Sequence, residues 1–75
     1  MTPIEDLDKT AALASDLSKR FPGDAYLVYR VHKPYDGNSY HVLCDEGMKT
    51  RSRLVKRFPG AEISQIGQYV KGAKV

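Results

Sequence analysis

The sequence predicts a small α+β domain with two layers, in which both helices pack on one face of a small sheet in the order α-β-β-α-β. Three observations lead to this fold class. Two stretches repeat apolar residues every three or four positions, as amphipathic helices do, and others alternate apolar and polar residues, as strands do. Pro-Gly and Asp-Gly pairs separate these stretches. We expect residues 1–75 to form a single domain with a thin core, because so short a chain buries little surface.

A capping box predicts where the first helix begins. Thr2 fits the N-cap, Pro3 the first helical position, and Glu5 follows three residues after the cap. Pro22 and Gly23 end the helix. Its expected inner face consists of the apolar residues at helical spacing, which are Ile4, Leu7, Ala11, Ala14, Leu17 and Phe21.

A hairpin follows the first helix. Period-two alternation over residues 25–33 and residues 40–45 predicts two strands. The pair Asp36-Gly37 between them is typical of a two-residue turn. Such a turn pairs Val31 with Val42, and this register gathers the apolar positions of both strands on one face.

A second helix is expected to run from a cap at Asp45 or Glu46 to Phe58, where Pro59-Gly60 ends it. Its inner side is predicted to consist of Met48, Leu54, Val55 and Phe58.

The stretch 62–70 allows two interpretations. Ile63 and Ile66 have the spacing of a helix, whereas Gly67 interrupts a helix and indicates a β-bulge. We favour a bulged strand, because residues 54–60 repeat residues 17–23 and a strand is expected after the first copy.

The repeat itself has six identities in seven positions, Leu17 to Gly23 against Leu54 to Gly60. It is either one helix-ending device used twice or the relic of a duplication. In the first interpretation the basic residues meet the last carbonyls of the helix, and Pro-Gly turns the chain.

Composition narrows the setting. Cys44 is the only cysteine, so no intramolecular disulfide can form, and the chain suits a reducing compartment. The start of the chain has no signal-peptide pattern, and no apolar run approaches the roughly 20 residues that span a bilayer. We therefore expect a cytoplasmic protein without a membrane partner.

Residues with catalytic or metal-binding potential do not form a set. In the expected register His32 and His41 face each other, but a third ligand is out of reach. Cys44 is expected on the opposite side of the sheet, without a base that would stabilise its thiolate. The six glycines are dispersed and form no phosphate-binding loop. We expect a protein that is not an enzyme and that uses neither a metal nor a cofactor.

Basic residues are concentrated in the second half of the chain. The formal net charge is +3, but residues 1–46 carry five Lys/Arg against eight Asp/Glu, and residues 47–75 carry seven against one. A helix with charges of one sign repels itself unless a partner compensates. The candidate binding residues are Lys49, Arg51, Arg53, Lys56, Arg57, Lys71 and Lys74. The leading hypothesis is contact with a nucleic-acid backbone, to which Thr50 and Ser52 add hydroxyl donors. A solvated helix face without a partner is the alternative.

A second candidate surface is the sheet face turned away from the helices, which aromatic and basic residues would make suitable for single-stranded nucleic acid. Its residues are Tyr26, Val28, Arg30, His32, His41 and Leu43. The same residues suit a protein interface or a homodimer. The second functional hypothesis is therefore a protein-interaction domain, a regulator or inhibitor that docks on an acidic protein surface or through an unpaired sheet edge.

Overall fold

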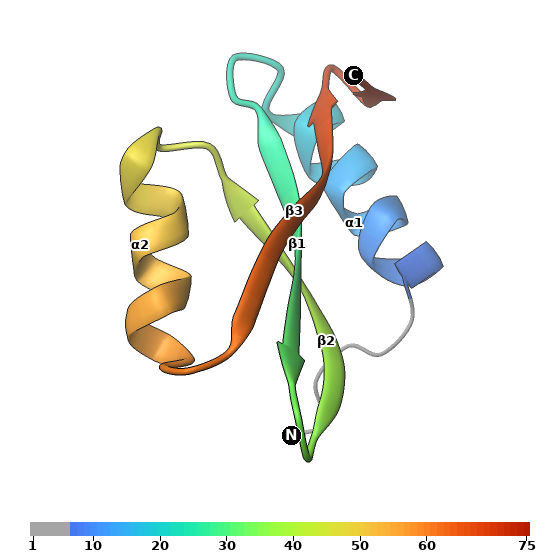
Figure 1. The fold of residues 1–75 in the computed structure, drawn as a ribbon. Coiled ribbons are helices and arrows are strands. Elements are labelled where there is room, and N and C mark those ends of the chain that lie inside the picture. The colour runs from blue at the N-terminus through green and yellow to red at the C-terminus, as the bar shows by residue number, and fades with distance from the viewer. Residues whose placement is uncertain (1–6) are drawn as a thin grey trace.

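The computed structural model describes residues 7–75 and confirms the α+β class and the predicted order of elements. A short additional strand follows the last predicted one. The elements are α1 (Leu7–Arg20), β1 (Tyr26–Lys33), β2 (Gly37–Cys44), α2 (Met48–Arg57), β3 (Glu62–Val70) and β4 (Ala73–Lys74) (Figure 1). The predicted capping box at Thr2, Pro3 and Glu5 lies outside the described residues.

The four strands form one antiparallel sheet with the order β2-β1-β3-β4. β1 lies in the middle and pairs with β2 on one side and with β3 on the other. In β3 the register shifts where Val28 faces Gly67 and Tyr29 faces Gln65, which leaves Ile66 as the extra residue of a β-bulge. The bulged strand predicted for residues 62–70 is thus confirmed.

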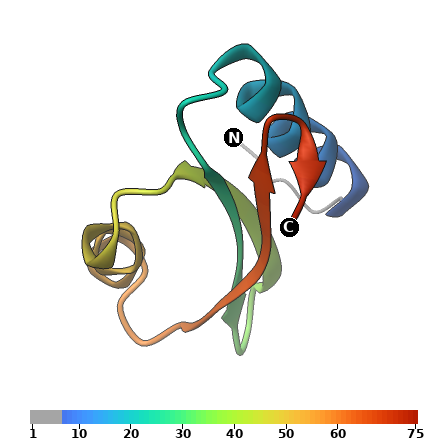
Figure 2. The same ribbon diagram turned by 90° about the horizontal axis from the view of Figure 1, so that it is seen from above.

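The expectation that both helices share one face of the sheet is wrong. α1 and α2 cover opposite faces, and Figure 2 shows the sheet between them. The reason lies in β1, which is apolar on both sides. Leu27, Tyr29 and Val31 are buried on the face covered by α2, and Val28 is buried on the face covered by α1. A strand with apolar side chains on both faces needs a cover on each.

The main core lies between α2 and the sheet. It consists of Leu27, Tyr29 and Val31 of β1, Ile63 of β3 and Leu54 of α2. Partly buried side chains from β2 and from the segment between α2 and β3 complete it, namely Leu43, Phe58 and Ala61.

Small residues bring α1 close to the other face. Thr10, Ala14 and Ser18, spaced four positions apart, are fully buried against the sheet. The predicted inner face included Ala14, which is buried, and Ala11 and Leu17, which are partly buried, whereas Leu7 and Phe21 are exposed. The apolar pattern therefore identified the side on which the helix packs, but small residues rather than large ones form the contact.

Two serines connect α1 to the turn between β3 and β4. The Ser18 hydroxyl accepts a hydrogen bond from the Gly72 N–H at 3.0 Å and donates one to the Ser15 carbonyl at 2.9 Å. The Ser15 hydroxyl donates to the Gly72 carbonyl at 2.6 Å. Gly72 adopts a φ of 84°, a conformation that favours glycine. The end of the chain is thereby attached to α1.

The hairpin loop is one residue longer than predicted. Lys33 pairs with Gly37, so residues 34–36 form the loop. Gly37, the first residue of β2 directly after the loop, adopts a φ of 76°, a conformation that favours glycine. The predicted pairing of Val31 with Val42 is therefore wrong. The change in register by an odd number of residues turns each side chain of β2 to the opposite face.

The repeated segment ends both helices through the same backbone hydrogen bonds. The N–H of Phe21 donates to the Leu17 carbonyl, and the Phe21 carbonyl accepts from the N–H of Asp24. Phe58 makes the two equivalent bonds at the end of α2. A duplication with two-fold symmetry about the antiparallel β1–β3 pair would place the helices on one face. Their opposite positions favour a helix-ending device used twice.

Candidate functional site

α2 begins at a glycine rather than at the predicted acidic cap. Gly47 is the N-cap residue, with a φ of 70°. The Asp45 carboxylate accepts a hydrogen bond from the Gly47 N–H at 2.9 Å, and the N–H of Glu46 donates to the Thr50 hydroxyl at 2.8 Å. Both carboxylates precede the first turn, where the positive end of the helix dipole favours them.

Thr50 and Leu54 determine which side of α2 faces the sheet, because both are buried. The Thr50 hydroxyl accepts a bond from the backbone of Glu46, so the predicted contact of Thr50 with a phosphate is wrong. The remaining side chains are exposed and form the outer face of α2, which consists of Met48, Lys49, Arg51, Ser52, Arg53, Val55, Lys56 and Arg57.

One arginine of the outer face also supports the sheet. The Nη1 of Arg51 donates a hydrogen bond to the Ile63 carbonyl of β3 at 2.9 Å. This carbonyl points away from β1, since Val31, its partner in the register, bonds to β2 instead. Arg51 therefore satisfies part of an otherwise open sheet edge.

Two further arginines of the outer face have partners within the protein. Arg53 lies 2.6 Å from the Glu46 carboxylate, and the Arg57 guanidinium lies 5.4 Å from the centre of the Phe58 ring. The ion pair is largely exposed, and such pairs contribute little to stability. Because α2 itself has no acidic residue, the outer face stays strongly positive.

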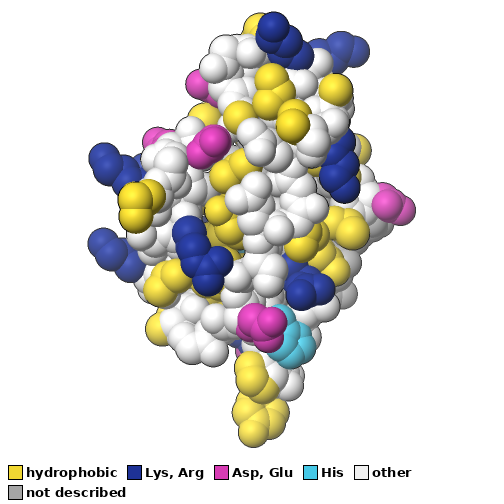
Figure 3. All heavy atoms as spheres, turned by 45° about the horizontal axis from the view of Figure 1, so that its top comes forward, with side chains coloured by type: hydrophobic (Ala, Val, Ile, Leu, Met, Phe, Trp, Pro, Cys, Tyr) yellow, Lys and Arg dark blue, Asp and Glu magenta, His cyan; other side chains and the backbone are white. Residues whose placement is uncertain are grey.

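Met48 and Val55 form an apolar strip within this positive face. They are 92% and 48% exposed and lie two helical turns apart, with Ser52 between them. Together with Arg51 and Lys56, these residues line a shallow groove of about 450 Å³. Figure 3 shows a hydrophobic side chain between basic ones at the left margin, over α2.

Met48 and Val55 were predicted on the inner side of the helix and not among the binding residues. The buried pair Thr50 and Leu54 marks the inner side, so the prediction was right for Leu54 and wrong for Met48 and Val55. Its four-residue spacing was a signal, but a threonine is an unusual core residue and the pattern of large apolar residues outweighed it.

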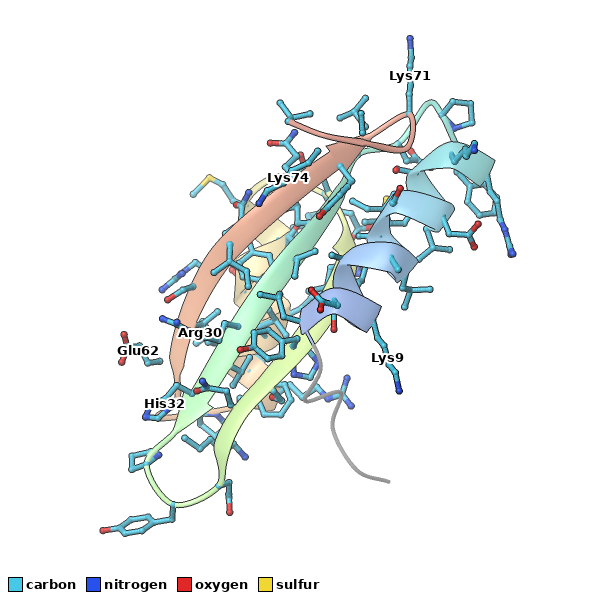
Figure 4. All side chains as sticks on the ribbon, turned by 90° about the vertical axis from the view of Figure 1, so that its right-hand side faces the viewer. Lys9, Arg30, His32, Glu62, Lys71 and Lys74 are labelled. Carbon is cyan, nitrogen blue, oxygen red and sulfur yellow. The ribbon has the colours of Figure 1, made fainter. Side chains whose placement is uncertain are left out.

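The two lysines of the C-terminal segment lie apart from α2. Lys71 is in the turn between β3 and β4, close to the end of α1, and Lys74 is in β4 (Figure 4). α2 lies on the other side of the sheet. The seven basic residues predicted as one surface are therefore divided between two sides of the molecule.

The predicted open sheet face is divided as well. The α1 face carries Tyr26, Val28, Arg30 and His32, and the α2 face carries His41 and Leu43. The longer hairpin loop causes this division, because it shifts the register so that each side chain of β2 points to the face opposite the predicted one. A helix covers part of each face, so neither is an open stacking platform.

The two histidines lie on different faces and have separate partners. The Nδ1 of His32 is 2.6 Å from the Asn38 side-chain oxygen, and the Nε2 of His41 is 2.9 Å from the Ser39 hydroxyl. Partial burial and, to a smaller extent, the charge of Arg57 lower the pKa of His41 below 6.5. The predicted cross-strand histidine pair is therefore wrong.

Cys44 is a half-buried free thiol on the α1 face. Burial, followed by the negative charge of Asp24, raises the pKa of this thiol above 9.0. A protonated thiol is a poor nucleophile at neutral pH. Within residues 7–75, no three His, Cys, Asp or Glu side chains are grouped so that they could hold a metal ion.

Comparison with protein-family models, with curated proteins and with solved structures finds no match to this chain. Within the described part of the chain, neither α1 nor α2 has both the length and the apolar character of a membrane-crossing helix.

Proposed function

We propose that this domain is a non-catalytic binding module that docks the outer face of α2 on an acidic protein surface. The exposed apolar strip of Met48 and Val55 within a positive helix face carries the proposal. Covering apolar surface contributes roughly 25 cal/mol per Å². Carboxylates on both sides of such a contact would pair with the exposed amines of Lys49 and Lys56 and fix the orientation of the partner.

A nucleic-acid backbone fits the outer face less well. Lys71 and Lys74, which were expected to extend the basic track, lie on the other side of the sheet. The Thr50 hydroxyl is buried, and Arg51 donates to the sheet edge. Phosphates and sugars also offer little apolar surface to cover Met48. These features favour a protein partner over the nucleic-acid hypothesis.

The expected partner is an amphipathic segment with apolar side chains between Asp and Glu residues. A helix laid into a groove is a common form of such contacts, and a few central apolar residues carry most of the affinity. The groove between Met48, Val55 and Lys56 matches one or two such side chains. We place this interaction in the cytoplasm, because the fold contains a free cysteine and no disulfide between described residues.

The test is a selection of short random peptides displayed on phage against the immobilised domain. We expect enriched peptides to combine acidic and large apolar residues. A selected peptide should bind in fluorescence anisotropy more weakly at high salt, and Met48→Ser should reduce its affinity about tenfold, equivalent to about 1.4 kcal/mol. Tyr35→Ser is the matched control, since Tyr35 is a fully exposed apolar residue at the hairpin tip.

Two results would contradict the proposal. The first is a set of neutral peptides, or peptides that bind Met48→Ser as tightly as the unchanged domain. The second is tight binding of single-stranded or duplex oligonucleotides that decreases steeply with salt and does not depend on Met48, which would support the nucleic-acid hypothesis instead.

A further inference from the structure

The two long edges of the sheet differ in how they are protected. The outer edge of β3 has a bulge at Ile66, and Arg51 donates to its Ile63 carbonyl. Near its end, β4 pairs with β3, and the N–H of Val75 donates to the Gln68 carbonyl at 2.8 Å. Bulges, basic side chains and short covering segments are the means by which proteins keep an edge from pairing with another chain.

Within residues 7–75, the outer edge of β2 has none of these features. Residues 37–44 contain no charged residue and no proline, and their pairing with β1 runs without a register shift. The N–H of Asp45 donates to the Ala25 carbonyl. Because hydrogen-bonded pairs alternate along an antiparallel ladder, every second residue before Asp45, such as Leu43 and His41, also bonds to β1. The residues between them point their N–H and C=O groups outward, and they are Asn38, Tyr40, Val42 and Cys44.

An apolar flank of α1 lies beside this edge. Ser15, Ser18 and Lys19 face the β3–β4 turn through their contacts with Gly72. At 100° per residue, Leu13 projects from the opposite flank, towards β2, and is 41% exposed. Figure 4 shows β2 at the border of the sheet on the side where α1 lies. An open strand edge and an exposed leucine thus adjoin each other.

We propose that the β2 edge and the Leu13 flank of α1 form the interface of a homodimer, in which β2 pairs antiparallel with β2 of a second copy. Such a pair has a two-fold axis perpendicular to the sheet, so the same residues meet on both sides. The α1 faces of both copies then lie on the same side of one continuous sheet. The Leu13 flanks approach each other across the new strand pair.

The charge pattern supports a second copy as the partner. Residues 37–44 carry no charged side chain, so two identical β2 strands can face each other without repulsion between like charges. With Val42 on the two-fold axis, Tyr40 lies opposite Cys44 of the second copy. This register keeps Asp36 away from Glu46 of the second copy, whereas a register centred on His41 would place these carboxylates opposite each other.

The size of the interface also requires both parts. A stable interface buries about 800 Å² per partner, or roughly 15% of the 5225 Å² that this chain exposes. One strand edge alone is too narrow, so the α1 flank must contribute. A domain this small has a thin core, and a second subunit is one of the usual ways to stabilise it. The proposal does not depend on the function proposed for α2, which lies on the opposite face.

Sedimentation equilibrium at micromolar and at near-millimolar concentration tests the assembly, with an expected increase in mass from 8.4 kDa towards twice that value. Amide hydrogen exchange followed by NMR tests the edge. The N–H groups of Tyr40 and Val42 should become protected as concentration rises, whereas those of His41 and Leu43 should be protected at every concentration. A monomer at near-millimolar concentration, or a dimer in which Tyr40 and Val42 exchange as fast as in the monomer, would overturn the proposal.

A matched pair of variants tests the α1 flank. Leu13→Lys should weaken the dimer at least tenfold, because it brings two like charges together near the axis. Leu7→Lys is the control, since Leu7 is 44% exposed but projects towards β3. It should leave dimerisation unchanged. Equal effects of the two substitutions, with both variants folded by circular dichroism, would refute the role of this flank.

Discussion

Replacing Ser18 with alanine tests how the C-terminal segment is attached to α1. The Ser18 hydroxyl is fully buried and accepts the hydrogen bond of the Gly72 N–H at 3.0 Å. Alanine has nearly the same size, so Ser18→Ala leaves the packing of α1 intact and removes only the hydroxyl. The N–H of Gly72 then lies against the helix without an acceptor.

The expected loss of stability follows from three contributions. A partly buried donor without a partner costs about 1–3 kcal/mol, and the bond to the Ser15 carbonyl adds little because that carbonyl keeps its helical partner. Alanine has a higher helix propensity than serine, which returns about 0.5 kcal/mol. We therefore expect Ser18→Ala to lower the free energy of unfolding by about 1–2 kcal/mol. For a domain of this size, that change lowers the melting temperature by roughly 5–15 °C.

Urea denaturation followed by far-ultraviolet circular dichroism measures this change, provided that the slope with denaturant stays constant. Ser52→Ala is the control, because Ser52 is an exposed helical serine that donates only to the Met48 carbonyl one turn earlier. It should change the free energy of unfolding by less than about 0.5 kcal/mol. If Ser18→Ala were equally neutral, the inference that its hydroxyl is needed by Gly72 would be wrong.

Two further predictions concern α2 and His41. Leu54 is the large side chain that α2 buries in the core. Leu54→Ala should therefore lower the free energy of unfolding by about 2–5 kcal/mol in the same urea experiment. A loss below about 1 kcal/mol would contradict the close packing of α2. The lowered pKa of His41 means that the unfolded chain binds a proton more readily than the folded one. Stability should therefore be complete above the unfolded pKa of about 6.5 and should decrease as the pH falls through the range below it. Urea midpoints measured at several pH values should show a weaker decrease for His41→Gln, and identical profiles would refute this assignment.

Local patterns were sufficient to predict the elements from α1 to β3, because helices and longer strands follow from periodicity and from their end signals, whereas the two-residue strand β4 was not predicted. In β3 the spacing of two isoleucines is typical of a helix, although the segment is a strand. Ile63 and Ile66 have helical spacing, but residues three positions apart in a strand point to opposite faces, so Ile63 faces α2 and Ile66 faces α1. Gly67, at the bulge, argued against a helix, and the repeat of residues 17–23 at residues 54–60 was the main reason to predict a strand.

The candidate site depended on longer-range features that the sequence does not display. One additional loop residue shifted the register of β2, so that His41 lies on the opposite face of the sheet from His32. The faces to which the helices pack follow from the two-sided burial of β1, which alternation alone does not reveal. The exposure of Met48 became evident only once Thr50 was seen to be buried. The basic character of α2, in contrast, is local and was predicted from composition.

The repeated segment that ends both helices has a consequence for the order of folding. Its hydrogen bonds join residues three or four positions apart, around Phe21 and around Phe58, so they can form within each helix by itself. The pairing of β1 with β3 joins Tyr26 to Tyr69 and must close a loop of more than half the chain, which is slow compared with local contacts. Both helices and their exits can therefore form before the strands meet, and each exit then directs its following strand towards the centre of the sheet. The step that limits the folding rate is expected to be the closure of β3 onto the β1–β2 hairpin.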